Sequence, residues 1–254
     1  MAGIRVEQVS VNFTTPGGDV LPALGPVSFQ IEPGQFVCLV GPSGCGKSTL
    51  IRVLAGLQPL TSGRAFINER PVEQPSPSVG LMFQNANLMP WRTVQDNIGL
   101  PLELAGAGKS QRHEVVESLL ERLGLSEFAN AYPAELSGGM AQRAALGRLL
   151  AQEPTVLLLD EPFGALDALT REKVSFDLMR VWAGQTQTVL MVTHDIQEAV
   201  LLADRVFVMS RRPGRLVADI AIPFQRPRAF DVIYDPAFTA LTKQVRESIA
   251  DSIV

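Results

Sequence analysis

One glycine-rich segment constrains the fold of this chain more than any other part of its sequence. Residues 41–49 have the sequence GPSGCGKST, which matches the pattern G-x-x-x-x-G-K-[ST]. They follow the apolar run Phe36 to Val40 and precede Leu50 to Leu54, where we expect a helix to begin. Glycines let the backbone curl so that its N–H groups point inward, and the N-terminus of the next helix adds partial positive charge. The order strand, loop, helix therefore predicts the phosphate-binding loop of a nucleotide site.

The residues of this loop have distinct expected roles. We expect Lys47 to reach the β- and γ-phosphates and the Ser48 hydroxyl to ligate Mg²⁺. The whole predicted loop consists of Gly41, Pro42, Ser43, Gly44, Cys45, Gly46, Lys47, Ser48 and Thr49.

Two carboxylates follow a second apolar run. Asp160 and Glu161 come directly after Val156 to Leu159. Because ligands of open α/β sheets bind at the carboxyl ends of the strands, this pair should lie beside the phosphate loop. We expect Asp160 to hold Mg²⁺, directly or through water, and Glu161 to polarise the attacking water as general base. Strands often end in acidic residues, so this pair alone is weak evidence of a catalytic site. The phosphate-binding loop earlier in the chain is what makes the assignment specific.

Strand-like and helix-like segments alternate along the chain, which favours an α/β fold with a mainly parallel sheet. A turn is expected at Pro16 to Asp19 and a proline-rich loop at Pro71 to Ser78. An amphipathic helix is expected over 111–123, with Ser110 as N-cap and Gly124 as C-cap. Another helix should follow Ser137. The expected strands are 4–13, Val27 to Ile31, Phe36 to Val40, Val156 to Leu159, Val189 to Val192 and Val206 to Met209.

The helical stretch 88–152 interrupts this alternation. We interpret it as a subdomain inserted into a single domain of residues 1–254, which ends in a helical tail at 223–254.

Composition excludes several classes of protein. With 254 residues, 46% of them apolar and 19% charged, the chain can bury a sizeable core and is not intrinsically disordered. Its longest apolar runs have five residues, whereas a bilayer span needs ~20. A net charge of −4 argues against non-specific binding to nucleic acid. The first residues lack the apolar stretch of a signal peptide, so we expect the protein in the cytosol.

The few cysteines and histidines are scattered. Cys38 lies in an apolar run and is expected in the core, and with Cys45 it makes no disulfide scaffold. The two histidines and two cysteines form no recognisable metal cluster, so any metal should arrive with a ligand. His113 falls on the polar face of its helix.

Residues 136–143, LSGGMAQR, resemble the signature motif of the ABC transporter ATPases. Other motifs of that family occur in the family's order. Gln84 matches the Q-loop glutamine, residues 165–167 resemble the D-loop, and His194 matches the switch histidine. The resemblance covers residues ~4 to ~215, and an ordered set of motifs is far more specific than any one of them. It implies an ATPase domain with a RecA-like parallel core, an antiparallel β subdomain and an inserted helical subdomain.

The resemblance also implies roles for individual residues, with ATP and Mg²⁺ as cofactors. Phe13 stands where the family stacks an aromatic on adenine, although the end of an alternating strand is also compatible with a core position. Gln84 would contact Mg²⁺ or the lytic water. His194 would contact the γ-phosphate and orient Glu161, and Asp167 belongs to the D-loop.

The signature segment would serve a second subunit. Ser137, Gly138 and Gly139 leave helix-terminal N–H groups accessible, which suits an anion but also an ordinary helix cap. The resemblance implies a head-to-tail dimer in which two ATP molecules each lie between one chain's phosphate loop and the other chain's Ser137 to Gly139. An isolated monomer would then hold half-sites.

The amino-acid sequence between the motifs resembles that of a narrower group within this family. Residues 87–98, 162–171, 195–200 and 211–215 look like the ATPase subunits of nitrate, sulfonate and taurine importers. This resemblance implies a peripheral protein at the cytoplasmic face of the inner membrane that energises uptake of a small anionic or related solute. Its expected partners are a second ATPase copy or paralogue, two integral membrane permease subunits and, indirectly, a solute-binding protein, with no nucleic acid.

Alternatives remain open at this point. A soluble cluster-assembly ATPase and a subunit of an exporter or lipid transporter share the motifs. Trp91 is compatible either with contact to a membrane subunit or with packing on its own domain. Two residues depart from the usual family text: Ala141 follows Gly-Gly-Met, and Gly147 stands where alanine is usual.

Overall fold

The structure is a computed structural model that describes residues 3–164, 166–182, 186–226 and 228–252. Its strands are β1 (Ile4–Thr14), β2 (Val20–Ile31), β3 (Phe36–Val40), β4 (Ser62–Ile67), β5 (Arg70–Pro71), β6 (Val79–Met82), β7 (Val156–Asp160), β8 (Thr188–Val192), β9 (Arg205–Met209) and β10 (Leu216–Ala221). Its α-helices are α1 (Lys47–Leu54), α2 (Val94–Leu104), α3 (Lys109–Arg122), α4 (Gly138–Leu150), α5 (Ala168–Trp182), α6 (Ile196–Leu202) and α7 (Pro236–Asp251). Short 3₁₀ helices are η1 (Ser126–Phe128), η2 (Pro133–Glu135) and η3 (Phe230–Tyr234).

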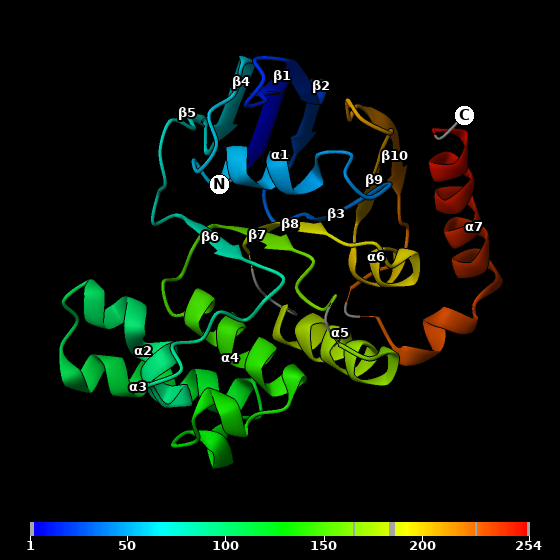
Figure 1. The fold of residues 1–254 in the computed structure, drawn as a ribbon. Helices are drawn as coiled ribbons and strands as arrows, with labels where there is room; N and C mark the ends of the chain where they lie inside the picture. Colours follow the sequence, from blue (N-terminus) through cyan, green and yellow to red (C-terminus); the bar gives the residue numbers. More distant parts are fainter. Residues whose placement is uncertain (1–2, 165, 183–185, 227, 253–254) are drawn as a thin grey trace.

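A six-stranded sheet in the order β10-β9-β3-β8-β7-β6 forms the centre of the molecule (Figure 1). The strands β9, β3, β8, β7 and β6 run parallel, and β10 pairs with β9 antiparallel. The predicted α/β fold with a mainly parallel sheet is therefore confirmed. Strand β8 lies between β3 and β7, so the segments that follow these three strands are neighbours at one edge.

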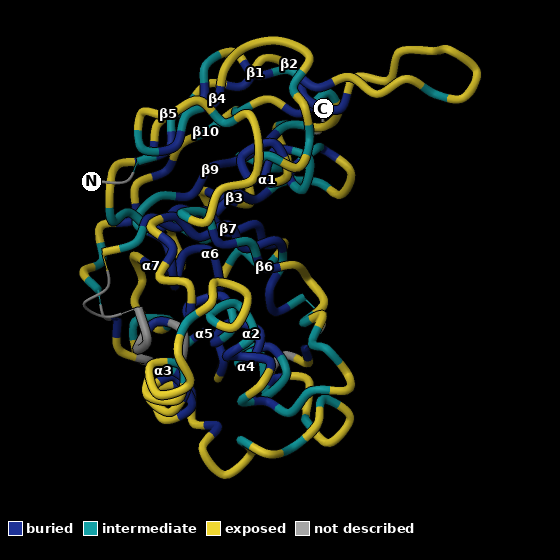
Figure 2. The backbone as a smooth tube through the Cα atoms, turned by 90° about the vertical axis from the view of Figure 1, so that its left-hand side faces the viewer, coloured by how far each residue is buried: buried dark blue, intermediate teal, exposed yellow. Residues whose placement is uncertain are grey.

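Alternating residues of the central strands enter two separate cores. In β3, Phe36, Cys38 and Val40 pack into the core that holds α2 to α7, whereas Val37 and Leu39 pack into the core that holds α1. Figure 2 shows the buried backbone concentrated on these strands. Burial on both faces explains why the strands are continuous apolar runs. Cys38 lies fully buried, as predicted, and burial raises the pKa of its thiol.

A four-stranded antiparallel sheet, ordered β2-β1-β4-β5, lies on the other side of α1 (Figure 1). The predicted turn at 16–19 joins β1 to β2, with Gly18 at a φ of 90°. The predicted loop from Pro71 is wrong by one residue, because Pro71 ends the edge strand β5, where a missing N–H is tolerated. Leu50, Ile51 and Leu54 of α1 are fully buried between the two sheets.

The helices α2, α3 and α4 follow β6 and precede β7, within the stretch predicted to be helical. The assignment of residues 88–152 to a separate inserted subdomain remains a prediction. The assignment of residues 223–254 to a helical tail also remains a prediction. The predicted N-cap Ser110 is wrong: α3 begins earlier, after Gly108, and Ser110 lies inside it. The predicted C-cap Gly124 is wrong by one residue: α3 ends at Arg122 with Leu123 as its C-cap, and Gly124 follows with a φ of 63°.

The unusual Gly147 has a packing reason. A β-carbon at this position of α4 would lie 2.8 Å from Leu123 Cδ1 and 3.1 Å from Ile98 Cδ1. A glycine inside a helix costs ~1 kcal/mol relative to alanine. Here it lets α4 approach α2 and the end of α3 closely.

A buried arginine from the C-terminal part of the chain closes the end of α6. Arg228 is 6% exposed, and its guanidinium donates hydrogen bonds to the carbonyl oxygens of Val200, Leu201 and Ala203. It also donates to the carbonyl oxygen of Phe224 at 2.9 Å. Burial lowers the pKa of Arg228 to about 10, so the side chain stays charged at neutral pH. The last carbonyl oxygens of a helix have no hydrogen-bond donors within the helix. The guanidinium of Arg228 provides these donors for α6.

We predict that Arg228→Met lowers the free energy of unfolding by about 3 kcal/mol, because it leaves several buried carbonyls without a donor while keeping most of the side-chain volume. Urea unfolding followed by circular dichroism measures the change. Arg246→Met, at an exposed position of α7, is the matched control and should change the stability by no more than about 0.5 kcal/mol. Equal effects of the two substitutions would contradict the assignment.

Candidate active site

The predicted phosphate loop connects β3 to α1 and is held tightly against β2. Gly46 has a φ of 103°, and a β-carbon there would lie 2.7 Å from Leu24 Cδ2 and 2.8 Å from the Ala23 carbonyl oxygen. Gly44 has a φ of 75°, but a β-carbon there would meet nothing within 4 Å. Both need the left-handed conformation that glycine adopts readily. One side of the loop is therefore packed and the other is open.

The ammonium group of Lys47 lies inside this loop. It donates to the carbonyl oxygens of Gly41 at 2.7 Å and Pro42 at 2.9 Å, and it lies 3.8 Å from Cys45 Sγ. Lys47 is 7% exposed. Its predicted role requires the ammonium to exchange these carbonyl oxygens for phosphate oxygens, which are stronger acceptors because they are charged.

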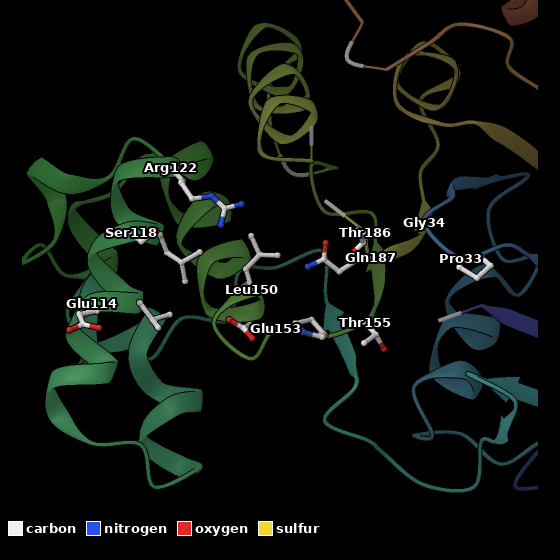
Figure 3. Close-up of a pocket in the computed structure, with 13 residues that line it drawn as sticks. Pro33, Gly34, Glu114, Ser118, Arg122, Leu150, Glu153, Thr155, Thr186 and Gln187 are labelled. Carbon is white, nitrogen blue, oxygen red and sulfur yellow. The ribbon is translucent and has the colours of Figure 1, made fainter. Parts of the chain in front are cut away.

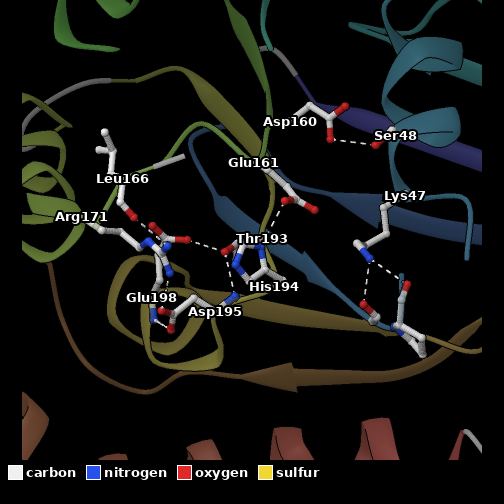
Figure 4. A network of polar contacts seen from close by, with 12 residues as sticks. Lys47, Ser48, Asp160, Glu161, Leu166, Arg171, Thr193, His194, Asp195 and Glu198 are labelled. Carbon is white, nitrogen blue, oxygen red and sulfur yellow. Dashed lines mark hydrogen bonds and ion pairs between the residues drawn. The ribbon is translucent and has the colours of Figure 1, made fainter. Parts of the chain in front are cut away.

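Ser48 and Asp160 meet between α1 and the end of β7. The Ser48 hydroxyl donates to Asp160 Oδ1 at 3.0 Å (Figure 4). Burial raises the pKa of Asp160, and the hydrogen bond from Ser48 opposes that shift. Hydroxyl and carboxylate oxygens are the ligands that Mg²⁺ prefers, and a divalent cation would offset the cost of burying this carboxylate. The pair therefore fits the predicted Mg²⁺ site.

Glu161 turns the chain sharply at the end of β7. Its φ is 48°, and its N–H donates to the carbonyl oxygen of Val192, the last residue of β8, at 3.0 Å. A non-glycine residue in this left-handed region costs ~1 kcal/mol, and such strain is concentrated at functional sites. The turn places Glu161 Oε2 3.1 Å from Nδ1 of His194, which follows β8 (Figure 4).

Gln84 lies at the same edge of the sheet. A β-carbon on Gly164 would lie 3.1 Å from Gln84 Nε2 and 3.3 Å from Glu161 Oε2, so both side chains border this glycine. The backbone carbonyl of Gln84 accepts a hydrogen bond of 2.7 Å from Gln142 Nε2. Gln142 belongs to α4 and is 4% exposed. This bond connects the loop after β6 to α4, the helix that Ser137 precedes.

The structure thus gathers most of the predicted site residues at the carboxyl ends of β3, β8, β7 and β6. Phe13 lies on β1, whose Val11 pairs with Leu24, the residue packed under the phosphate loop. It is 37% exposed, so a core position for Phe13 is wrong. Its stacking on adenine remains a prediction.

The signature segment lies next to the start of α5. Ser137 Oγ accepts from the N–H of Met140 at 3.3 Å, which confirms the predicted helix cap. β-Carbons on Gly138 and Gly139 would lie 3.1 Å from Leu166 Cδ2 and 2.9 Å from Thr170 Cγ2. The two glycines therefore allow α4 to approach the residues after β7.

Asp167 belongs to the segment between β7 and α5, which Gly138 approaches. Its carboxylate accepts a hydrogen bond of 3.0 Å from the Thr170 N–H, and hydrogen bonds from Thr170 lower its pKa. Ala165, the other end of the predicted D-loop, lies outside the described residues.

Gly214 is a site residue that motif matching did not predict. It forms two backbone hydrogen bonds with β2. The Gly214 N–H donates to the Ala23 carbonyl oxygen at 3.1 Å, and the Gly214 carbonyl oxygen accepts from the Gly25 N–H at 3.0 Å. A β-carbon on Gly214 would lie 2.0 Å from the carbonyl oxygen of Cys45. The segment after β9 therefore supports the phosphate loop from behind. In the sequence Gly214 is a single glycine among basic residues, and this pattern is too weak to predict that the residue contacts the phosphate loop.

A further cavity, of ≈ 1010 Å³, lies at the opposite ends of the strands (Figure 3). Thr155 and Gln187, just before β7 and β8, line one side, and Ser118 and Arg122 of α3 line the other. It is remote from Asp160 and His194 along both strands, so it is not part of the candidate site.

Comparison with known proteins gives consistent results. The ABC transporter family profile matches residues 24–164. The chain is 44% identical to the taurine import ATP-binding protein of Rhizobium johnstonii, over 96% of this chain and 95% of that protein. It is 42% identical to the nitrate import ATP-binding protein of Synechococcus elongatus, over 94% of this chain and 88% of that protein.

Solved structures agree with the sequence relatives. A dimeric ATP-binding cassette in a post-hydrolysis state, bound to ADP and Pi, superposes with a TM-score of 0.76 at 30% identity. The match covers 87% of this chain and all of that one.

We predict that Gly214→Ala weakens nucleotide binding by about tenfold to a hundredfold, because the methyl group would displace the phosphate loop and small misplacements at a site have effects of this size. Titration with a fluorescent ATP analogue measures the affinity. Gly108→Ala is the matched control, since a β-carbon there would meet nothing within 4 Å. Unchanged affinity in folded Gly214→Ala would show that the loop does not depend on this support.

Proposed function

Since this chain belongs to the ABC transporter family, as an ATPase of the ATP-binding cassette type, we propose that it energises an importer of small anionic or related solutes. The observation that carries the ATPase chemistry is the convergence of Lys47, Ser48, Asp160, Glu161 and His194 at one edge of the sheet. The identity to taurine and nitrate import proteins over nearly their whole lengths supports the importer assignment.

We place ATP across the phosphate loop and the hairpin of β1 and β2. The adenine stacks on Phe13, and the N–H groups of residues 41–49 cradle the phosphates together with Lys47. Ser48, Asp160 and Gln84 would hold Mg²⁺, which neutralises charge on the phosphates. The open side of the loop at Gly44 leaves room for the phosphates to approach the backbone.

Hydrolysis needs a base for the attacking water and a group that fixes this base. In our proposal the Glu161 carboxylate accepts a proton from the water as the water oxygen attacks the γ-phosphorus. The bond between that phosphorus and the oxygen that bridges it to the β-phosphate breaks, so ADP and inorganic phosphate are the products. His194 holds that carboxylate through Nδ1, at the distance of 3.1 Å already present, and contacts the γ-phosphate with its other nitrogen. Gln84 completes the positioning of the water and Mg²⁺.

A second copy or close paralogue completes each site. Ser137, Gly138 and Gly139 offer N–H groups at the start of α4, and Asp167 lies in the adjacent segment, just before α5. In the proposed head-to-tail dimer these residues face the ATP bound by the other chain. ATP binding closes the dimer, and hydrolysis with phosphate release reopens it.

The proposed membrane partners dock on the helices beside the Q-loop. A cavity of ≈ 350 Å³ is lined by apolar residues from the loop after β6, from α2 and from α4, among them Phe83 and Leu104. Leu104 is 79% exposed, and Trp91 nearby in sequence is 72% exposed, so packing of Trp91 on its own domain is wrong. The described residues contain no helix that could cross a membrane. Two permease subunits would provide the pathway, served by a solute-binding protein, with this chain at the cytoplasmic face of the inner membrane.

We predict that Glu161→Gln lowers kcat for ATP hydrolysis by about 10²- to 10⁴-fold, the range that general-base catalysis contributes. Nucleotide binding and ATP-dependent dimerisation should persist, because an amide has the same shape and still binds His194. Phosphate release measures the rate, and sedimentation with ATP measures the dimer. Full ATPase activity of this variant would exclude Glu161 as the base.

The importer assignment predicts which proteins copurify with the tagged chain from its native host. After mild extraction, mass spectrometry should detect two polytopic membrane subunits. Leu104→Asp should reduce their recovery by about tenfold, since a buried charge in an apolar contact costs more than 1.4 kcal/mol. Leu57→Asp, at another exposed leucine, is the control. Recovery of soluble partners alone would leave the ATPase standing and overturn the transport assignment.

A further inference from the structure

A buried carboxylate that the proposed reaction does not use lies close to His194. Glu198, in the first turn of α6, is 6% exposed. Burial raises the pKa of this carboxyl group, with a further contribution from nearby Asp195. Burying a carboxylate is costly unless it gains strong hydrogen bonds. A neutral residue in its place would avoid that cost, so the position of Glu198 calls for a physical reason.

Helix capping does not supply that reason. Asp195 already caps α6, since its Oδ1 accepts from the Glu198 N–H at 3.1 Å. A glutamate at the third helical position usually reaches back to the N–H of the cap residue. Here the N–H of Asp195 donates instead to Thr193 Oγ1 at 3.0 Å, and Glu198 reaches past the cap to Thr193.

The hydrogen bonds of Glu198 involve the two residues on either side of His194, Thr193 and Asp195. The Thr193 hydroxyl donates to Glu198 Oε2 and accepts from the Asp195 N–H, and Asp195 in turn accepts from the Glu198 N–H. The residues before and after His194 are therefore tied into one closed ring of hydrogen bonds (Figure 4). A ring of this kind fixes the backbone from which the imidazole projects toward Glu161.

Two contacts anchor this ring to α5. Ser175 Oγ donates to Glu198 Oε1 at 3.2 Å, and the Arg171 guanidinium contacts Asp195 Oδ2 at 3.2 Å. Arg171 also donates to the carbonyl oxygen of Leu166, next to Asp167, at 3.0 Å. The backbone around His194 is thus connected to the segment that we place at the dimer contact.

We propose that Glu198 is a positioning residue for ATP hydrolysis: by holding Thr193 and Asp195 it keeps His194 in place to fix Glu161. This inference rests on the proposed roles of His194 and Glu161. Glu198 touches neither the nucleotide nor the water. It acts through His194 alone, so its removal should slow the chemical step without weakening ATP binding.

A double-mutant cycle tests this directly on the complex recovered from the native host. Glu198→Gln keeps the shape but removes the charged acceptor, and it should lower kcat by about tenfold, within the range found for groups that orient a catalytic residue. KM for ATP should stay unchanged. In a His194→Ala background, Glu198→Gln should cause no further loss, because the group it positions is gone.

Substitutions of the ring's hydroxyl groups provide matched controls. Thr193→Val removes the hydroxyl at constant volume and should reproduce the loss, whereas Thr193→Ser keeps the hydroxyl and should restore the rate. Ser175→Ala removes the contact that anchors Glu198 to α5 but leaves the ring itself intact, so it should lower kcat less than Thr193→Val does.

The outcomes separate the two levels of the proposal. If His194→Ala is as active as the wild type, the proposed role of His194 fails. If His194→Ala is slow but Glu198→Gln has the wild-type kcat, or lowers kcat equally in both backgrounds, the positioning role of Glu198 is overturned.

Discussion

The pairing of β8 with both β3 and β7 is the constraint on which the rest of the structure depends. Parallel register brings the ends of the three strands to one edge, with Leu39 opposite Val192 and Asp160 opposite Val192. The phosphate loop, His194 and the carboxylates each follow one of these strands. No side chain of the site has to reach far, because the backbone ladder already sets their spacing. The two apolar cores on either face keep that ladder dry and rigid.

The functional loops are in turn held by contacts from residues outside them. Gly214 supports the phosphate loop from behind, Glu198 encloses the residues around His194, and Gln142 binds the backbone of Gln84. The contact of Gln142 joins the loop after β6 to α4, and Arg171 joins the residues around His194 to α5. These hydrogen bonds are the routes by which we expect a change at the nucleotide to reach α4 and α5.

Much of this arrangement could be predicted from the sequence, because phosphate-binding loops and buried strands have strong local signals. Phe36 to Val40 is such a strand, and its bounds are confirmed. Ser137 as a helix cap is also a local feature. The prediction failed at Ser110, where the choice among neighbouring small residues depends on packing. Glu198, Gln142 and Arg228 could not be recognised, because burial of a polar side chain is decided by elements far away in the chain.

We propose that one edge of the sheet binds Mg²⁺ and ATP and that a second copy completes the site. The most direct test is an experimental structure of Glu161→Gln with ATP and Mg²⁺. We predict that the Lys47 ammonium leaves the carbonyl oxygens of Gly41 and Pro42 for the phosphates, with Ser48 and Asp160 at the metal. Residues Ser137 to Gly139 of a second copy should cover the same nucleotide. ATP bound elsewhere, for instance in the cavity beside Arg122, or bound without any contact from a second copy, would overturn the proposed site.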